Sequence, residues 1–191
     1  MANLDRPMGF RPVSNGIAGT APRITHYAVS ATLTAAIGEG DLLQRGKLGV
    51  LSVVDATDVT EIQNIIGVSA QYVAATPGAG STCAVYDDPS QKFLVQCDDN
   101  AVSTAALLQE VIGLAARVVP TTYNTTTLQS KMELDGSSIT STAVTATETW
   151  DCLQILGMDS LSVASGSWAD LYVQIRPSHH VLSGYHGARQ T

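Results

Sequence analysis

Short apolar segments separated by turn-forming residues constrain this chain more than any other feature. From Arg23 to Arg176, runs of β-branched and alternating residues are interrupted by Gly, Asp and Asn. Such runs are typical of β-strands. We expect strands at residues 24–31, 47–54, 62–73, 82–86, 93–97, 130–134, 150–158 and 171–176. Eight short strands at fairly regular spacing predict a mainly β fold, either a small β-barrel or a sandwich.

One short helix is expected within this pattern, at residues 102–116. The segment contains good helix formers such as Ala105, Leu107 and Glu110. Ser103 or Thr104 is the candidate N-cap, and Gly113 should end the helix.

The two ends of the chain differ from its centre. Residues 1–23 hold three prolines and three glycines, which favour an extended N-terminal arm, either anchored or disordered. Residues 177–191 have a polar ending and predict a C-terminal surface tail. The Thr-rich stretches 120–127 and 140–149 are expected as exposed segments of one domain. Residues 24–176 should therefore form a single β-rich domain.

The clearest local unit runs from Cys83 to Cys97, where two apolar runs flank an Asp-Asp-Pro-Ser turn. This arrangement predicts a β-hairpin in which Val85 lies opposite Val95 and the two cysteines face each other. With Cys152, the chain has an odd number of widely spaced cysteines. We expect buried, reduced thiols rather than disulfides or a zinc site.

A glycine interrupts an apolar segment at Gly67, Gly113 and Gly157. Each glycine indicates a bulge or a close approach of backbone, but three short matches do not establish an internal repeat.

Charge and hydropathy exclude several classes of protein. The 10 Lys and Arg residues against 17 Asp and Glu residues give a net charge of −7. This balance opposes sequence-independent nucleic-acid binding, which depends on basic side chains. No apolar run is long enough for a membrane-spanning helix, and residues 1–7 lack the apolar core of a secretory signal. We expect a protein that is made and used without crossing a membrane.

Motifs for catalysis are missing from the sequence. It has no Gly-x-Ser-x-Gly elbow, phosphate-binding loop or His-Glu-x-x-His pair. Asp87 and Asp88 precede a proline, which is ordinary turn chemistry. His179, His180 and His186 are the best metal candidates, but a surface tail lacks the enclosing contacts that fix metal ligands. We therefore expect no enzyme, no cofactor and no metal site.

Four places in the chain resemble the head decoration, or capsid cement, proteins of tailed double-stranded DNA phages. They are residues 1–12 with Gly9-Phe10-Arg11-Pro12, residues 85–96 with Tyr86-Asp87-Asp88-Pro89, residues 133–135, and residues 153–157 followed by 173–175. Their order and spacing, rather than any one motif, carry the similarity. The chain departs from the family in continuing for fifteen residues after Arg176.

The resemblance implies a structural protein of the virion. Such proteins are β-rich oligomers, made in the host cytoplasm, that sit on the outer capsid surface and clamp major capsid protein subunits. The partners it implies are the major capsid protein and other copies of the chain, as a trimer or dimer. We expect residues 2–22 to lie along a capsid subunit or a neighbouring copy, ordered only on binding. The implied contact residues are Arg6, Pro7, Phe10, Arg11 and Pro12 in the arm, and Tyr86, Asp87, Asp88 and Pro89 in the hairpin.

Two other functions remain open from the residues alone. A virion-surface module that binds glycans or attaches to a host would need an exposed aromatic platform formed by two or more of Tyr123, Trp168 and Tyr185. Core or interface packing explains the Trp and Tyr residues more simply. A small β-barrel enzyme would need His26 or His180 beside a carboxylate in a cleft, which no spacing supports.

Overall fold

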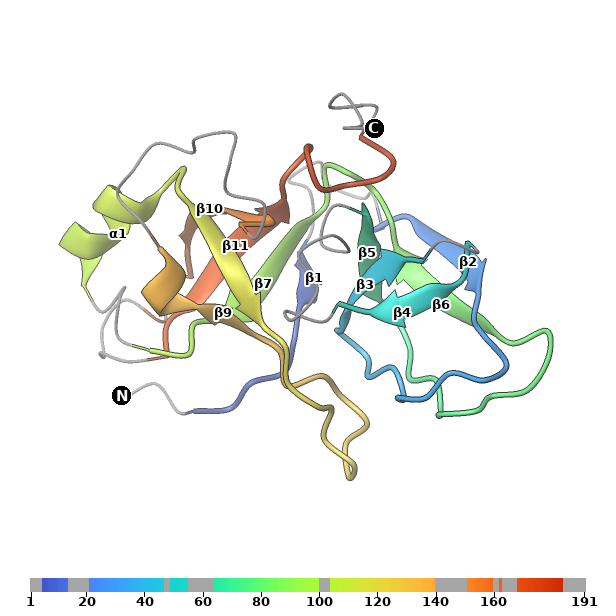
Figure 1. Ribbon diagram of the computed structural model, residues 1–191. Helices are drawn as coiled ribbons and strands as arrows, with labels where there is room; N and C mark the ends of the chain where they lie inside the picture. Colours follow the sequence, from blue (N-terminus) through green and yellow to red (C-terminus); the bar gives the residue numbers. More distant parts are fainter. Residues whose placement is uncertain are drawn as a thin grey trace.

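Two antiparallel β-sheets lie side by side in the computed structural model of this chain (Figure 1). The structure describes residues 5–13, 21–46, 49–54, 64–99, 104–139, 151–159, 162 and 168–183. The expected mainly β class is confirmed, and neither sheet closes into a barrel.

The larger sheet has six strands. Their spatial order is β1 (Arg11–Val13), β7 (Lys92–Gln96), β11 (Asp170–Ile175), β10 (Leu153–Met158), β8 (Ala115–Val119) and β9 (Glu133–Asp135). Cys97, just beyond β7, forms an isolated bridge with Leu134 of β9. The edge strand β9 therefore meets the end of β7, the neighbour of the opposite edge strand β1, at one isolated bridge.

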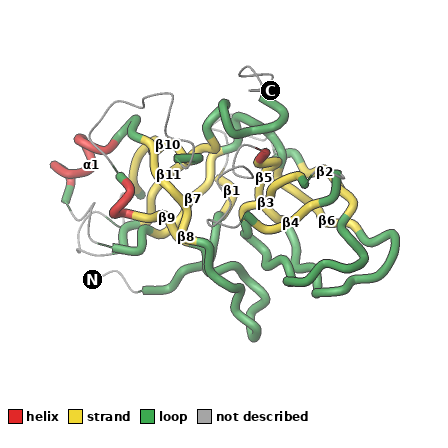
Figure 2. The backbone as a smooth tube through the Cα atoms, in the orientation of Figure 1, coloured by secondary structure: helices red, strands yellow, loops and turns green. Residues whose placement is uncertain are grey.

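The smaller sheet has five strands. Their order is β2 (Ile24–Ala28), β6 (Thr82–Tyr86), β5 (Ile65–Ser69), β3 (Leu42–Arg45) and β4 (Leu51–Val53). Among the described residues, the helical elements are α1 (Ala105–Val111) and the 3₁₀ turn η2 (Gly136–Ser138). Long loops before β3, before β6 and before β9 gather at one end of the molecule (Figure 2).

Buried side chains form two cores on opposite faces of the five-stranded sheet. Leu42 belongs to a large core shared with the six-stranded sheet, where it joins Phe93 and Val95. The adjacent Leu43 belongs to a second core that residues of the neighbouring loops complete. Successive residues of a strand point to opposite faces, so β3 contributes to both cores. The five-stranded sheet is consequently the middle layer of the protein.

All eight expected strands are present, most of them shorter than predicted, and the described residues form three further strands. β3 escaped prediction because its two adjacent leucines are both buried and show no alternation. β8 was predicted as the end of the helix because Ala115 and Ala116 are good helix formers. Ala116 is instead buried opposite Leu153 of β10.

The helix itself is confirmed but shorter than expected. Thr104 is the N-cap, since its hydroxyl accepts a hydrogen bond from the backbone N–H of Leu107 at 3.2 Å. The helix ends at Val111, and Gly113 follows with a φ of 87°. A left-handed glycine just after a helix is the usual way for the backbone to leave it.

The predicted hairpin between residues 83 and 97 is wrong. Its two strands form, but β6 pairs with β2 and β5, whereas β7 pairs with β1 and β11. The turn between them carries the chain from one sheet to the other. Cys83 and Cys97 accordingly lie in different cores, and both are buried free thiols, as is Cys152.

Gly67 confirms the expected bulge. The pairing of β5 with β3 shifts register beside this residue, and its φ is 152°. A Cβ atom at this position would lie within 2.0 Å of the Tyr86 carbonyl oxygen. The close contact between β5 and β6 therefore requires glycine here. A second register shift occurs beside Gly157.

Both chain ends join the domain more closely than the sequence indicated. The N-terminal arm contributes β1, an edge strand of the six-stranded sheet, although the sequence predicted that the β-rich domain begins at residue 24. Residues 177–183 are not a free tail either. The backbone of Ile65 bonds to His179 and Val181 at 2.9 and 2.8 Å. The remainder of the expected tail lies outside the described residues.

Candidate functional site at the junction of the arm and the two sheets

The N-terminal arm is fixed to its own domain by backbone and side-chain contacts. The backbone N–H of Arg6 donates to the side chain of Gln96 at 2.9 Å, and that of Phe10 donates to the Gly40 carbonyl at 2.9 Å. Phe10 is 1% exposed and meets Phe93 edge-on, with ring centroids 6.3 Å apart. Phe10 is therefore a core residue of its own domain.

Other arm residues remain accessible. The guanidinium of Arg11 is half-exposed and lies 3.6 Å from the Asp170 carboxylate. Arg6 is exposed, and Met8 is 39% exposed. Pro7 and Pro12 are half-buried. The arm thus has a buried side that anchors it and an outer side available for contact.

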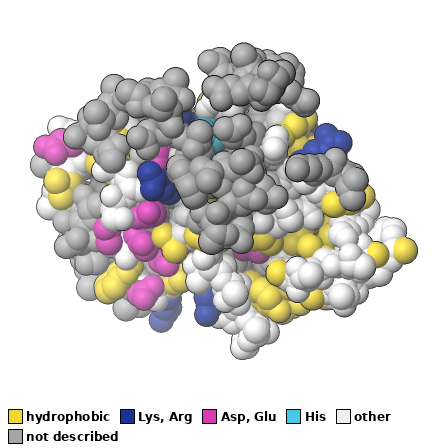
Figure 3. Space-filling view, in the orientation of Figure 1, with side chains coloured by type: hydrophobic (Ala, Val, Ile, Leu, Met, Phe, Trp, Pro, Cys, Tyr) yellow, Lys and Arg dark blue, Asp and Glu magenta, His cyan; other side chains and the backbone are white. Residues whose placement is uncertain are grey.

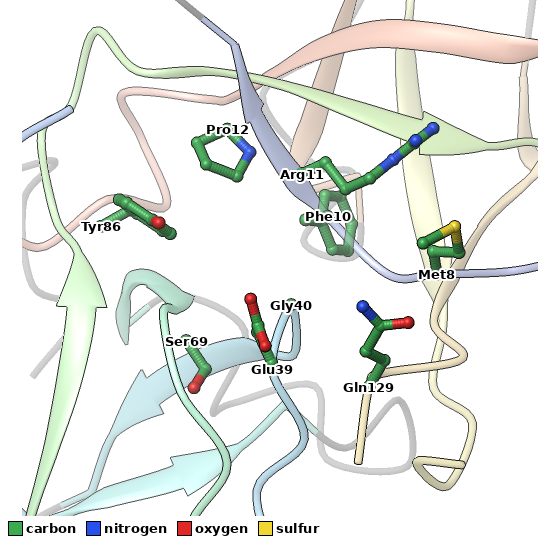
Figure 4. Close-up of a pocket in the computed structure, with 9 residues that line it drawn as sticks. All are labelled: Met8, Phe10, Arg11, Pro12, Glu39, Gly40, Ser69, Tyr86 and Gln129. Atoms are coloured by element: carbon green, nitrogen blue, oxygen red, sulfur yellow. The ribbon is translucent and has the colours of Figure 1, made fainter. Parts of the chain in front are cut away.

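A small hollow lies where the arm meets the five-stranded sheet (Figure 4). Its volume is about 50 Å³. Four of the nine contact residues predicted from the sequence line this hollow: Phe10, Arg11, Pro12 and Tyr86. The other five, Arg6, Pro7, Asp87, Asp88 and Pro89, do not. No sequence pattern pointed to the remaining lining residues, which come from the arm, loops and strand ends. These are Met8, Glu39, Gly40, Ser69 and Gln129.

The hollow suits a water molecule or a partner's small side chain rather than a metabolite. Binding sites for small molecules usually span about 300 to 1,000 Å³. Burial, and then the nearby charge of Glu39, raise the pKa of the Tyr86 phenol. Tyr86 is therefore a neutral hydrogen-bonding group at the rim of the hollow.

Asp87, Asp88 and Pro89 lie beyond Tyr86 and have structural partners. Asp87 accepts hydrogen bonds from the Arg23 guanidinium at 2.7 Å and from the Tyr27 hydroxyl at 2.6 Å. Burial raises the pKa of Asp87, but these donors outweigh it and hold the pKa below its usual value. The carboxylate therefore fastens the end of β6 to β2.

The neighbouring residues form the turn that the sequence predicted. Asp88 accepts hydrogen bonds from both the backbone N–H and the hydroxyl of Ser90. The carbonyl of Pro89 accepts a hydrogen bond from the Gln174 side chain at 2.8 Å. Turn chemistry was correctly inferred, although the turn joins two sheets rather than two paired strands.

The histidines expected in a surface tail are buried. His180 is 3% exposed, and its Nδ1 accepts a hydrogen bond from the Leu182 N–H at 3.1 Å. Burial lowers the pKa of His180 to about 4. The Nδ1 of His179 lies 2.9 Å from the Ser178 hydroxyl. His186 lies outside the described residues.

A different group has metal-like spacing: ligand atoms of Cys97, Asp98 and Asp99 lie within 4.8 Å of one another. Burial raises the pKa of the Cys97 thiol to about 12, so it carries its proton. Asp98 accepts a hydrogen bond from the Gly136 N–H at 2.9 Å, and Cys97 lies 3.6 Å from Asp99. These contacts explain why the three side chains lie close together, and the group is a structural junction.

Tyr123 forms an aromatic pair, but with an unexpected partner. Its ring lies 5.4 Å from that of Tyr72, at an interplanar angle of 51°, and both rings are half-exposed. Trp168 is half-buried beside Asp99, to whose carbonyl its N–H donates at 3.2 Å. Tyr185 lies outside the described residues. The sequence favoured core or interface packing for Tyr72 over stacking on a sugar.

Comparisons with known proteins do not identify the chain. No protein-family model matches it, and no curated protein is significantly similar to it. In the part of the chain that the structure describes, no helix is long and apolar enough to span a membrane.

Proposed function

We propose that the protein is a structural decoration protein that binds the outer surface of an assembled phage capsid and clamps neighbouring major capsid protein subunits. The observation that carries the proposal is where the residues resembling that family lie. Most of them fall on five strands of the six-stranded sheet, β1, β7, β9, β10 and β11, while Val85 and Tyr86 end β6 of the five-stranded sheet. Segments far apart in the sequence thus gather mainly in one sheet, which supports a shared structural module.

The chemistry of the junction also favours a structural role. The hollow beside the arm is much smaller than a typical ligand site, and Asp87 is engaged in holding strands together. A net charge of −7 is suited to the outside of a capsid rather than to contact with packaged DNA.

The proposed mechanism is mass action. A protein that binds the assembled lattice but not separate subunits stabilises the lattice, and several simultaneous contacts strengthen the binding. Because Arg6 to Val13 are already held by the domain, ordering of residues 2–22 only on binding does not describe this segment. The proposed capsid contact is instead the outer side of the arm, chiefly Arg6 and Met8.

The test mixes purified protein with matching capsids that lack it, and measures co-sedimentation and capsid melting temperature. We expect saturable binding and a raised melting temperature. Absence of binding to both immature and expanded capsids would exclude the function.

Two variants test the arm within the same assay. Arg6→Glu and Met8→Asp should each weaken binding at least several-fold, whereas Arg45→Glu, an equal charge reversal at an exposed residue of β3, should not. Full binding by both arm variants would exclude the arm as the contact but leave the function intact.

Glycan binding is a second candidate, and the Tyr72–Tyr123 pair is the observation that favours it. Half-exposed aromatic rings can stack on the apolar faces of sugars, and the pair lies beside a Thr-rich loop. A glycan array with the full chain tests this candidate. Binding that is lost in Tyr72→Ala and Tyr123→Ala, but kept in Trp168→Ala, would support it, and an array without binding would exclude it.

A further inference from the structure

Residues 177–183, which we call the C-terminal strap, connect the two sheets. The strap leaves the end of β11 in the six-stranded sheet and reaches the first residue of β5 in the five-stranded sheet (Figure 1). There the Ile65 N–H donates to the His179 carbonyl at 2.9 Å, and the Val181 N–H donates to the Ile65 carbonyl at 2.8 Å. His180, between them, forms an isolated parallel bridge with Ile65. The backbone of one β5 residue therefore holds the strap at this point.

Several other hydrogen bonds close the strap on itself. The N–H groups of His179 and His180 donate to the Arg176 carbonyl at 2.9 and 3.1 Å, and the Ser183 N–H donates to the His180 carbonyl at 3.2 Å. The pairing of β5 with β3 and β6 involves other partners. Local units of this kind can open without unfolding the rest of a domain. The strap can therefore leave β5 while both sheets stay folded.

His180 is the buried centre of the strap. Its side chain is 3% exposed, and its Nδ1 accepts a hydrogen bond from the Leu182 N–H at 3.1 Å. A ring nitrogen that accepts a hydrogen bond carries no proton, so the neutral imidazole has its proton on Nε2. The buried Nε2 has no hydrogen-bond partner among the described residues. The strap is thus built around a neutral ring that already leaves one donor unpaired.

The charged groups that face His180 from other elements are Asp87 and Asp88, in the turn after β6, and Arg23, before β2. Burial is the largest influence and lowers the pKa of His180 to about 4; the two carboxylates oppose this effect and Arg23 adds to it. Asp87 already accepts hydrogen bonds from Arg23 at 2.7 Å and from Tyr27 at 2.6 Å. A second proton on His180 would therefore create a buried cation beside a carboxylate that is already engaged.

We propose that protonation of His180 releases the C-terminal strap from β5 while both sheets stay folded. The second proton would occupy Nδ1, so Nδ1 could no longer accept the Leu182 N–H. Release places the imidazolium in water, where its charge costs nothing. The strap is therefore an acid-sensitive element of the fold. This inference does not depend on capsid binding.

The pH range follows from the two states of His180. The released ring has the ordinary pKa of 6.5, whereas the pKa of the docked ring is about 4. Docking is therefore strongest above pH 6.5 and weakens as the pH falls toward 4, because the released state binds the proton more tightly. Each unit of pKa difference is a tenfold effect, so docking should be roughly 100-fold weaker at pH 4 than at pH 7.

Hydrogen exchange of the full chain, followed by NMR from pH 7 to pH 4 and corrected for the intrinsic exchange rate, measures this release. Protection of the Ile65 and Val181 amides should fall by up to roughly 100-fold over this range. Protection should be kept at Ile155 and Ser69, whose N–H groups donate to the Leu114 and Asp41 carbonyls within the folded domain. The imidazole signals of His180 should show the proton on Nε2 at pH 7.

Two variants and one control complete the test. His180→Gln keeps an acceptor for the Leu182 N–H but takes up no proton, and His180→Phe fills the site without a titratable group. In both, strap protection should be independent of pH, whereas His26→Gln, at an exposed residue of β2, should lose protection in acid as the parent does.

Three outcomes would overturn the proposal. The parent strap could keep its protection down to pH 4, or a docked variant without His180 could lose protection as the parent does. Equal loss at Ile155 and Ser69 over the same pH range would show unfolding of the whole domain instead of release of the strap.

Discussion

Burial and nearby donors have opposite effects on the charge of Asp87. Its carboxylate is 2% exposed and accepts hydrogen bonds from Arg23 and Tyr27. Asp87→Asn keeps the shape but removes the charge, so one donor loses a good acceptor. We expect a loss of about 1 to 3 kcal/mol in the free energy of unfolding at pH 7, measured by urea denaturation. Asp88→Asn, in the same turn, should cost less than about 1 kcal/mol.

The pH dependence of the Asp87 effect follows from its lowered pKa. The folded state binds its proton more weakly than the unfolded state, so the stabilisation is present above the ordinary Asp pKa. It is lost as the pH falls through the lowered value. The difference between the parent and Asp87→Asn should therefore shrink in acid. A constant difference from pH 7 down to the acid limit would contradict this explanation.

The pKa of Glu133 is shifted in the opposite direction, upward. Burial, followed by the charges of Asp5 and Asp98, raises its pKa to about 7. Acidic side chains gather on the side of the molecule that carries the six-stranded sheet (Figure 3). Above pH 7 the charged Glu133 destabilises the fold, and the penalty is relieved as the pH falls from about 7 toward its ordinary value of 4.5.

The corresponding variant is Glu133→Gln, which should raise the melting temperature by a few degrees at pH 8 and have little effect near pH 4.5. Glu110→Gln, at an exposed position of α1, is the control and should change neither value appreciably. If Glu133→Gln stabilised the protein equally at both pH values, the unfavourable charge of Glu133 could not be the cause of the stabilisation.

At the scale of elements, β1 illustrates how a local pattern can be interpreted correctly but placed wrongly. The prolines and glycines of the arm predicted an extended chain, and the described part of the arm, residues 5–13, ends in the extended strand β1. Its docking depends on Phe10 reaching Phe93, a contact across more than eighty residues of sequence. No local pattern encodes such a contact.

The variant Phe10→Ala tests how much the docking of the arm stabilises the fold. Removing a buried phenylalanine leaves a cavity and should cost about 3 to 5 kcal/mol in the free energy of unfolding. Met8→Ala, in the same arm but partly exposed, should cost less than about 1 kcal/mol. Similar small losses in both variants would mean that the arm is not packed against the domain in solution.

At the scale of the whole molecule, the larger core joins the two sheets. Val68 of β5 packs in the same core as Phe93 of β7 and Leu171 of β11. Neither sheet can therefore lose its packing without exposing the other. We expect one cooperative unfolding transition, with equal calorimetric and van 't Hoff enthalpies. Two resolved transitions, or loss of hydrogen-exchange protection in one sheet alone, would show that the sheets are independent units.

The sequence by itself determined the mainly β class, the existence of eight strands, the helix with an N-cap at Ser103 or Thr104, the turn at Asp88 and the burial of the cysteines. These features depend on local propensities and on the alternation of side chains, which a short segment already contains. The exposed acidic balance and the absence of catalytic motifs were likewise visible without a structure.

Only the tertiary structure decided which strands pair and which residues meet. β6 and β7 are joined by a short turn, yet they belong to different sheets, because each gains more burial beside its distant neighbours than beside the other. The same competition moved Ala115 and Ala116 from helix to strand and brought Phe10, Tyr86 and Gln129 to one hollow. Long-range packing sets these outcomes, and a sequence pattern shows only which face of a strand is apolar, not what covers it.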